Sequence, residues 1–143
     1  MLSVIIVNWN VRDLLRECLR SLAAGREQLE LEVIVVDNAS ADGSVGMVAE
    51  KYPLATVIAC DANLGFSAAN NRGSAVAGGD YLLFLNSDTV VGENALIAPL
   101  TYLKSRPQVG ALTVRLVYPN GERDPDNHRG FPTPWNALCH FTG

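Results

Sequence analysis

Four short apolar runs recur along the chain, and each one ends in polar or turn-forming residues. They cover residues 2–7, 31–36, 55–59 and 81–85, and the third run is the weakest. Continuous apolar runs of this length are typical of parallel strands that are covered on both faces. The pattern therefore predicts four strands of a parallel sheet, and it predicts that the strand beginning at Tyr81 is buried on both sides.

Helical periodicity separates these runs. Apolar residues recur at helical spacing from Val11 to Gly25, again from Val45, and between residues 93 and 104. Small residues at 67–77 predict a helix that lies close to the sheet or to a ligand. Asn10 and Asp42 are predicted to cap two of these helices. Alternating strands and helices predict an α/β fold, a Rossmann-like, mostly parallel sheet flanked by helices.

The last part of the chain follows a different pattern. Residues 109–118 alternate loosely, as a strand does, and the turn signal at 119–121 predicts a hairpin. From Glu122 the sequence is polar and rich in proline as far as Pro134. We therefore expect an α/β domain over residues 1–118, followed by an irregular C-terminal segment over residues 119–143.

Length and composition limit the classes of function. The chain has 143 residues, the length of one domain, and a net charge of −4 without the basic patch that nucleic-acid binding requires. No apolar run approaches the roughly 18 residues of a membrane span, and the first residues do not resemble a signal peptide. We expect a protein without a transmembrane segment, either cytoplasmic or at the cytoplasmic face of a membrane. Three widely spaced cysteines predict reduced thiols.

Polar side chains follow three of the predicted strands. Asn8 ends the first run, Asp37 ends the second, and Asn86 to Asp88 end the fourth. Because ligands of open α/β sheets bind beyond the carboxyl ends of the strands, we expect these residues to converge on one site. The chain contains neither of the glycine-rich phosphate loops, GxGxxG and GxxxxGK[ST]. A carboxylate such as Asp88 suits Mg²⁺ or Mn²⁺ placed between the protein and a phosphate.

Four motifs of the chain resemble those of the inverting family 2 glycosyltransferases, which have the GT-A fold, and in particular their rhamnosyltransferase-like branch. They are Val-Ile-Ile-Val-Asn-Trp-Asn at 4–10, Val-Ile-Val-Val-Asp-Asn-Ala-Ser-Ala-Asp-Gly-Ser at 33–44, Asn-Leu-Gly-Phe-Ser-Ala-Ala-Asn-Asn-Arg-Gly at 63–73, and Leu-Leu-Phe-Leu-Asn-Ser-Asp-Thr at 82–89. The resemblance implies transfer of a sugar from a nucleoside diphosphate sugar, of UDP or dTDP type, to a saccharide or lipid-linked acceptor.

The same resemblance implies roles for individual residues. Asp37 stands where the family's acid reads the base, and Asn8 lies in the first nucleotide-contacting loop. The segment that lines the nucleotide and donor sugar matches Asn63, Gly65 and Asn70. Residues 86–88 occupy the place of the metal-binding DxD motif, so that Asp88 would hold Mg²⁺ or Mn²⁺. Asn86 replaces the usual first acid and would contact the ribose or a metal-bound water.

The family's catalytic base has no match in this sequence. After Asp88, the acids Glu122, Asp124 and Asp126 fall in a proline-broken stretch that does not resemble the base motif, and His128 and His140 lack partner spacing for a metal. The chain thus looks like the donor-binding half of a longer domain, which predicts an exposed apolar surface and self-association. Two other functions remain open here: a nucleotide-binding module without turnover, and a nucleotidyltransferase-like enzyme.

Overall fold

The computed structural model describes residues 1–25, 29–92 and 94–124. Its internal contacts divide the chain into two units, Met1–Ser105 and a second unit that begins at Arg106, earlier than the predicted domain end at residue 118. The helices and strands named below all lie in the first unit. None of the helices in the described part of the chain has the length and apolar character needed to cross a bilayer.

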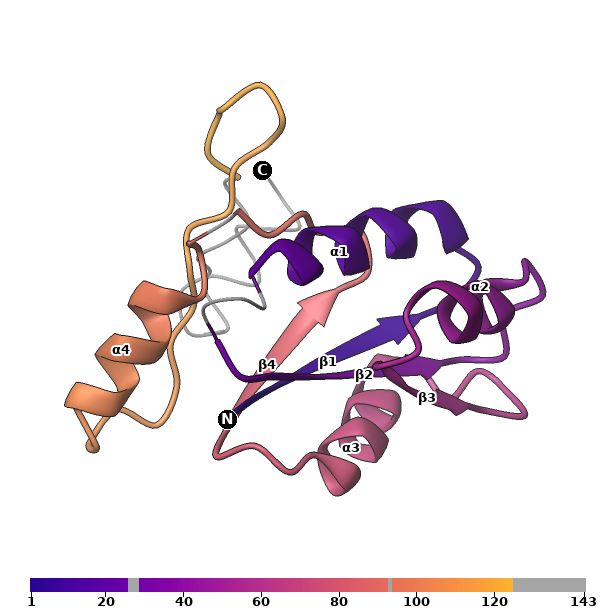
Figure 1. The fold of residues 1–143 in the computed structure, drawn as a ribbon, viewed down its shortest axis with the longest axis horizontal. Coiled ribbons are helices and arrows are strands. Elements are labelled where there is room, and N and C mark those ends of the chain that lie inside the picture. The colour runs from indigo at the N-terminus through magenta and orange to yellow at the C-terminus, as the bar shows by residue number, and fades with distance from the viewer. Residues whose placement is uncertain (26–28, 93, 125–143) are drawn as a thin grey trace, which may run out of the picture. The chain divides into compact units, whose positions relative to one another are not determined.

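The first unit contains the predicted parallel sheet. Its strands are β1 (Leu2–Asn8), β2 (Leu31–Asp37), β3 (Thr56–Ala59) and β4 (Tyr81–Asn86). All pairs are parallel and the spatial order is β3-β2-β1-β4. The helices are α1 (Arg12–Gly25), α2 (Ser44–Lys51), α3 (Phe66–Val76) and α4 (Ile97–Ser105), as Figure 1 shows. The predicted α/β class is confirmed.

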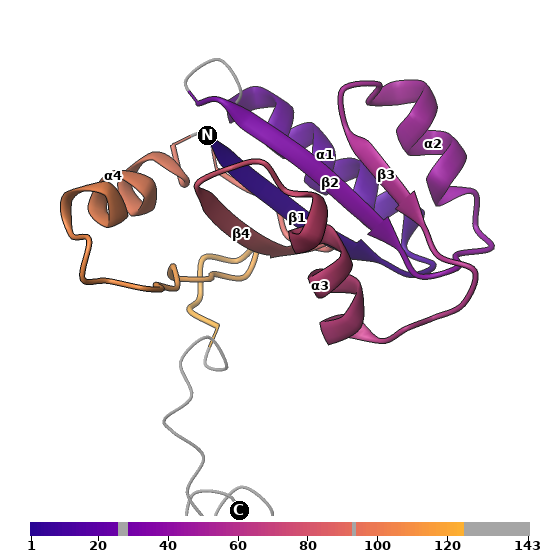
Figure 2. The same cartoon turned by 90° about the horizontal axis from the view of Figure 1, so that it is seen from below.

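Side chains of the two central strands alternate between two separate cores. Val4 and Ile6 of β1 pack in a core with residues from α1 and α2, whereas Ile5 packs on the other face with Ala69 of α3. Figures 1 and 2 show α1 and α3 on opposite sides of the sheet. Because side chains of a strand point alternately to its two faces, β1 and β2 are buried on both sides, as predicted.

Helix α3 lies against the sheet because Gly73 has no side chain. A Cβ atom at this position would lie 2.5 Å from Cγ2 of Ile5 and 3.2 Å from Cγ2 of Val36. Both neighbours are fully buried and have little room to move. The prediction that small residues bring this helix close to the sheet is therefore confirmed.

Strand β4 differs from the prediction of burial on both faces. Leu83 and Leu85 pack against the first core, but Leu82 is 44% exposed and Phe84 is 53% exposed. The cause is that β4 is an edge strand of the sheet, whereas α3 packs on β1 and β2 and leaves this face of β4 uncovered. An exposed apolar surface was expected, and this face provides one; self-association through it stays a prediction.

Two hydrogen-bonded side chains hold the amino ends of the strands together. Glu32 of β2 accepts hydrogen bonds from Ser3 Oγ of β1 and from the N–H of Gly78, and Ser3 Oγ accepts one from the N–H of Gly79. The bond from Ser3, followed by that from Gly78, lowers the pKa of Glu32 below its ordinary value. This network fixes the connection between α3 and β4 at the edge opposite to the polar strand ends.

The second unit is described over residues 106–124. The turn predicted at 119–121 is present, with the N–H of Gly121 donating to the carbonyl of Tyr118. The predicted strand over 109–118 was wrong, because the structure gives an isolated antiparallel bridge between Val117 and Arg123 in its place. Asp126, His128, His140 and Cys139 lie outside the described residues.

Replacing Gly73 with Ala is expected to destabilise the first unit. The added methyl group overlaps Ile5, and overpacking of a core costs about 1–3 kcal/mol, which exceeds the gain of up to about 1 kcal/mol in helix propensity. Gly46→Ala in α2 is the matched control, because nothing lies within 4 Å of its added Cβ. Urea unfolding followed by circular dichroism measures both. Equal stability of the two variants would contradict the close packing of α3.

Candidate functional site at the carboxyl edge of the sheet

Asn8 and Asp37 end the two central strands and lie side by side. They are register partners in the β1–β2 pair, and Asn8 Nδ2 donates a 2.8 Å hydrogen bond to Asp37 Oδ1. Asn8 is fully buried and Asp37 is 2% exposed. The predicted juxtaposition of these two residues is confirmed, whereas their contact with a ligand stays a prediction.

The second oxygen of the Asp37 carboxylate also has a partner. The N–H of Ser40 donates to Asp37 Oδ2 at 2.8 Å, and Ser40 Oγ accepts a 3.1 Å bond from Asn8 Nδ2. A buried carboxylate is costly unless it is hydrogen-bonded, and here both oxygens accept a bond. Asp37 therefore shapes the loop that follows β2, in addition to any role toward a ligand.

Asn8 carries an acceptor without a partner. Its Oδ1 atom is buried and accepts no hydrogen bond from the described residues, while its Nδ2 atom faces the acceptor oxygens of Asp37 and Ser40. Exchanging the amide oxygen and nitrogen would set two acceptors against each other, so the orientation follows from the chemistry. A buried orphan acceptor costs about 1–3 kcal/mol, which a water or a ligand N–H would offset.

The loops after β1 and β2 are joined by three more hydrogen bonds. The N–H of Asn10 donates to Ser40 Oγ at 2.9 Å, Asn10 Oδ1 accepts from the N–H of Ala41 at 2.8 Å, and the N–H of Asn38 donates to the carbonyl of Asn8. Asn10 and Ala39 have φ angles of 54° and 61°, in the region that L-residues rarely adopt. Such strain persists where surrounding contacts fix the backbone and is common at functional sites.

Helix capping at this edge differs from the prediction. The prediction that Asn10 caps α1 was wrong, because its side chain bonds to Ala41; the N–H of Arg12 donates instead to Asp42 Oδ2 at 2.8 Å. Asp42 Oδ1 accepts from the N–H and Oγ of Ser44, although the N-cap position of α2 is Gly43. Desolvation opposes ionisation, but the bonds from Ser44 and Arg12 outweigh it and lower the pKa of Asp42. One carboxylate thus joins the starts of both helices.

Asn38 connects the third loop of this edge. It is 3% exposed, its Oδ1 accepts from the N–H of Leu64, and its Nδ2 donates to the carbonyl of Gly65, both at 3.4 Å. Gly65 has a φ angle of 80°, and its N–H donates to Asn63 Oδ1 at 2.9 Å. Asn63 and Gly65 are themselves exposed. The structure therefore ties the predicted donor segment to the end of β2 through Asn38, which the sequence analysis did not single out.

Asn70 lies one turn into α3 and is 8% exposed. Its Nδ2 atom donates to the carbonyl of Phe66 at 3.1 Å, one turn earlier in the same helix. This amide was predicted to be either a satisfied buried group or a ligand contact. The intrahelical bond accounts for one of its two N–H donors. Contact of Asn70 with a ligand stays a prediction.

Asn86 and Asp88 extend the edge from the strand on the other side of β1. Asn86 is the last residue of β4, and the N–H of Thr89 donates to its carbonyl, forming a turn that contains Ser87 and Asp88. Asn86 and Asp88 are exposed, unlike Asn8 and Asp37. Below the turn, burial and, second, the charge of Asp88 raise the pKa of the Cys18 thiol to about 12.

The oxygen atoms that the side chains of this turn offer suit a hard divalent cation. Among the described residues, no three side chains of His, Cys, Asp or Glu gather into a metal-binding group. Mg²⁺ and Mn²⁺ do not require one, since they bind through one or two carboxylates, substrate phosphate oxygens and water. An exposed Asp88 beside an amide and a hydroxyl would provide the protein's share of such a shell.

Trp9 is a further residue of this edge that the sequence analysis did not assign. It stands between Asn8 and Asn10 and is 56% exposed. An exposed indole next to a polar strand end offers a face on which a planar ring stacks. Its signal in the sequence was a large aromatic residue in a loop, between two asparagines.

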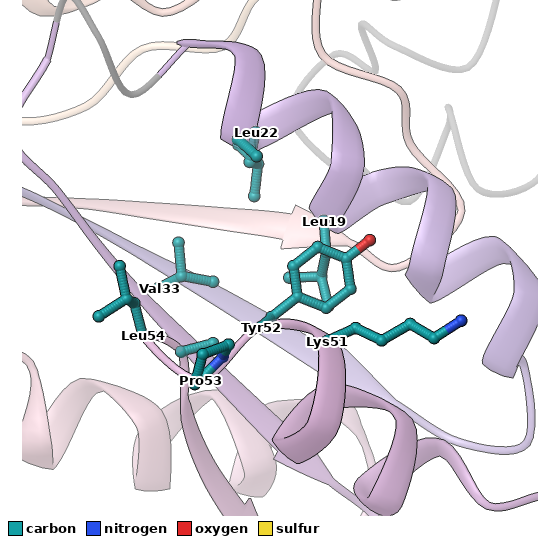
Figure 3. A pocket seen from close by; sticks show the side chains of 9 residues that line it. Leu19, Leu22, Val33, Lys51, Tyr52, Pro53 and Leu54 are labelled. Carbon is teal, nitrogen blue, oxygen red and sulfur yellow. The ribbon is translucent and has the colours of Figure 1, made fainter.

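A separate apolar pocket of about 270 Å³ lies away from these residues. It is formed by the end of α1, the end of α2 and the residues before β3, and its lining includes Leu19, Leu22, Val33, Tyr52 and Leu54 (Figure 3). Val33 belongs to the amino-end half of β2, and Ala55 immediately precedes β3. The pocket lacks the convergent acids and amides of the carboxyl edge, so the edge is the better candidate site.

Asp37 and Asp88 are expected to differ sharply in their effect on stability. Asp37→Ala leaves the N–H of Ser40 without its acceptor and empties a buried position, at a cost of about 2–3 kcal/mol. Asp88→Ala removes the same charge from an exposed turn and is expected to change stability by less than about 0.5 kcal/mol. Urea midpoints of the two variants and the wild type measure the difference. Two equal midpoints would contradict a structural role for Asp37.

Comparisons with known proteins agree with this geometry. The model of the family described as "Glycosyl transferase family 2" matches residues 3–143. An N-acetylglucosaminyl-diphospho-decaprenol L-rhamnosyltransferase of Mycobacterium tuberculosis is 28% identical over 147 residues, which cover 91% of this chain and 48% of that protein. The chain spans less than half the length of the curated relatives considered.

Two solved structures share the fold. S. aureus TarS, residues 1–349, in complex with UDP is 25% identical with a TM-score of 0.67, covering 74% of this chain and 32% of that one. The mannosyltransferase PcManGT from Pyrobaculum calidifontis, in complex with GDP-Man and Mn²⁺, is 28% identical with a TM-score of 0.64, covering 80% of this chain and 33% of that one. The predicted GT-A type of fold is confirmed, and the chain belongs to glycosyl transferase family 2.

Proposed function

We propose that this chain forms the donor site of an enzyme that transfers a sugar from a nucleoside diphosphate sugar to a saccharide or lipid-linked acceptor, with inversion at the anomeric carbon. The observation that carries the proposal is a single sheet edge with two kinds of polar group. Buried Asn8 and Asp37 form a fixed floor, and Asp88 stands exposed beyond β4. A nucleoside diphosphate needs both, a rigid polar contact for the base and a cation site for the phosphates.

Base recognition is proposed for Asp37 and Asn8. An ionised carboxylate has about four acceptor sites, of which the bonds from Asn8 and Ser40 use two. The orphan Oδ1 of Asn8 adds a further acceptor. Uracil and thymine each present a ring N–H donor, as does guanine, whereas adenine and cytosine do not. These acceptors therefore suit a nucleotide sugar of UDP or dTDP type, and the titration below distinguishes it from one of GDP type. The exposed Trp9 would stack on the same base.

The rest of the donor is proposed to lie along the loops of the same edge. Asn63 and Gly65 are exposed in a loop that Asn38 ties to β2, and Asn70 follows in α3. Asn86 ends β4 beside β1. These residues would contact the ribose, the diphosphate and the donor sugar. The UDP complex of TarS and the GDP-Man complex of PcManGT support a nucleotide at this kind of site.

Asp88 would hold Mg²⁺ or Mn²⁺ together with the diphosphate of the donor. The Mn²⁺ in the PcManGT complex supports a divalent cation in this fold. When bound, the cation would supply positive charge that neutralises the departing diphosphate. With Asn86 in place of a second acid, the protein offers one carboxylate here, so the affinity for metal would depend strongly on bound nucleotide.

The proposed reaction is a direct displacement. An acceptor hydroxyl loses its proton to a base and attacks the anomeric carbon from the side opposite the diphosphate, so that the glycosyl bond to the leaving oxygen breaks and the configuration inverts. We assign no base: Glu122 lies in a turn of the second unit, where its Oε2 accepts a hydrogen bond from Asn120 Nδ2 and its N–H donates to Asn120 Oδ1. The name of the mycobacterial rhamnosyltransferase supports a lipid-linked acceptor.

Calorimetric titration tests the donor site directly. UDP or dTDP is expected to bind in the presence of Mn²⁺, and Asp88→Ala is expected to weaken this binding at least about tenfold, because the carboxylate that holds the cation is lost. Glu50→Ala is the matched control, since it removes an exposed acid of α2 from elsewhere on the surface.

Three other results of the titration would each contradict a different part of this proposal. Nucleotide binding with the same affinity with and without Mn²⁺, and in the Asp88 variant, would contradict the metal role of Asp88. A folded protein that binds none of UDP, dTDP and GDP would contradict the donor site altogether. Binding of a nucleoside triphosphate in preference to every diphosphate would favour the nucleotidyltransferase alternative.

A further inference from the structure

Helix α1 contacts both ends of the segment that carries Asp88. At the first end, the thiol of Cys18 donates to the carbonyl of Asn86, with 3.7 Å between sulfur and oxygen. At the second end, the N–H of Val91 donates to Ser21 Oγ at 3.0 Å. Cys18 and Ser21 are one turn apart on α1, so one short stretch of helix holds residues 86–91 at two points.

The hydroxyl of Ser21 is oriented for this contact. Its proton is donated to the carbonyl of Cys18 at 2.7 Å, which leaves the oxygen lone pairs to accept from Val91. Both partners are backbone groups, and Ser21 is partly buried. Val91 in turn packs against the first core. A purely apolar residue at position 21 would leave the Val91 N–H without this acceptor.

Between the two fixed ends, the backbone forms the turn that displays Asp88. The carbonyl of Asn86 accepts bonds from both the Cys18 thiol and the N–H of Thr89. Ser87 and Asp88 are the central residues of this turn, and the side chain of Asp88 is exposed. Fixing the ends of a short segment removes backbone freedom before a ligand arrives, which reduces the entropy lost on binding.

We propose that Cys18 and Ser21 are positioning residues, which hold the turn at 86–91 so that Asp88 is presented in the conformation that binds a divalent cation. The inference rests on the proposed function, in which Asp88 holds the metal. It extends that function to two residues of α1 that need not touch nucleotide, sugar or metal. Cys18 acts from within the core and Ser21 from its margin, so Ser21 gives the cleaner test.

The test measures Mn²⁺ affinity in the complete chain, with saturating UDP, by electron paramagnetic resonance of free Mn²⁺. Ser21→Ala is expected to weaken Mn²⁺ binding about tenfold, as loss of a residue that orients a metal ligand typically does. UDP binding without metal is expected to stay unchanged, because the contacts of Asn8 and Asp37 are intact. Ser21→Thr keeps the hydroxyl and is expected to restore Mn²⁺ affinity.

Ser105→Ala is the matched control. Ser105 Oγ donates to the carbonyl of Tyr102 with the same spacing of three residues, but from α4 and at an exposed position. Its substitution is expected to leave Mn²⁺ affinity at the wild-type value. Thermal unfolding of each variant separates a loss of the fold from a loss of the positioned turn.

The outcomes separate this inference from the function on which it rests. Wild-type protein that binds UDP without any dependence on Mn²⁺ would overturn the metal site, and this inference with it. A metal-dependent wild type whose affinity is matched by Ser21→Ala would overturn this inference alone. Equal weakening of metal-free UDP binding would also overturn it, because the effect would then be a general loss of structure.

Discussion

A carboxylate at 2% exposure is stable only if its oxygens are hydrogen-bonded, and in this protein the bond from Asn8 Nδ2 to Asp37 begins a network on which the whole carboxyl edge depends. The N–H of Ser40 donates to the second oxygen of this carboxylate, and Ser40 Oγ accepts a second hydrogen bond from Asn8 Nδ2. Two backbone groups are fixed by the same residues, because the N–H of Asn10 donates to Ser40 Oγ and the N–H of Asn38 donates to the carbonyl of Asn8. Two residues with positive φ are held in the same loops, so the floor of the site is fixed before any ligand binds.

The edge combines this fixed floor with a more open part. Asn63, Gly65 and Asp88 are exposed, yet each belongs to a loop that buried or partly buried side chains hold in place. Asn38 ties the loop of Asn63 and Gly65 to β2. Cys18 and Ser21 tie the segment that carries Asp88 to α1. Rigid elements thus supply the positions, and in the proposed function the exposed loops would supply the contacts with the ligand. The arrangement is what a ligand with a flat base and a charged diphosphate requires.

The strands of the sheet and the polar residues at their carboxyl ends could be predicted from the sequence, because both are local patterns along the chain. The apolar runs located all four strands, and parallel pairing brought Asn8 and Asp37 together. Contacts between loops could not be read in the same way. Asp42 accepts hydrogen bonds from the first residues of two helices, and Asn10 bonds to neither helix, because the loop after β2 lies beside the loop after β1. The open face of β4 likewise depends on where α3 packs, which the pattern of β4 itself does not encode.

Amide hydrogen exchange with and without UDP and Mn²⁺ is a direct test of whether the carboxyl edge of the sheet binds a nucleoside diphosphate. If the carboxyl edge binds the nucleotide, exchange is expected to slow at residues 8–12, 37–44, 63–66 and 86–91, with no change at residues 78–81 of the opposite edge. Exchange that slows around Tyr52 and Leu54 of the apolar pocket, while the carboxyl edge is unaffected, would contradict binding at that edge.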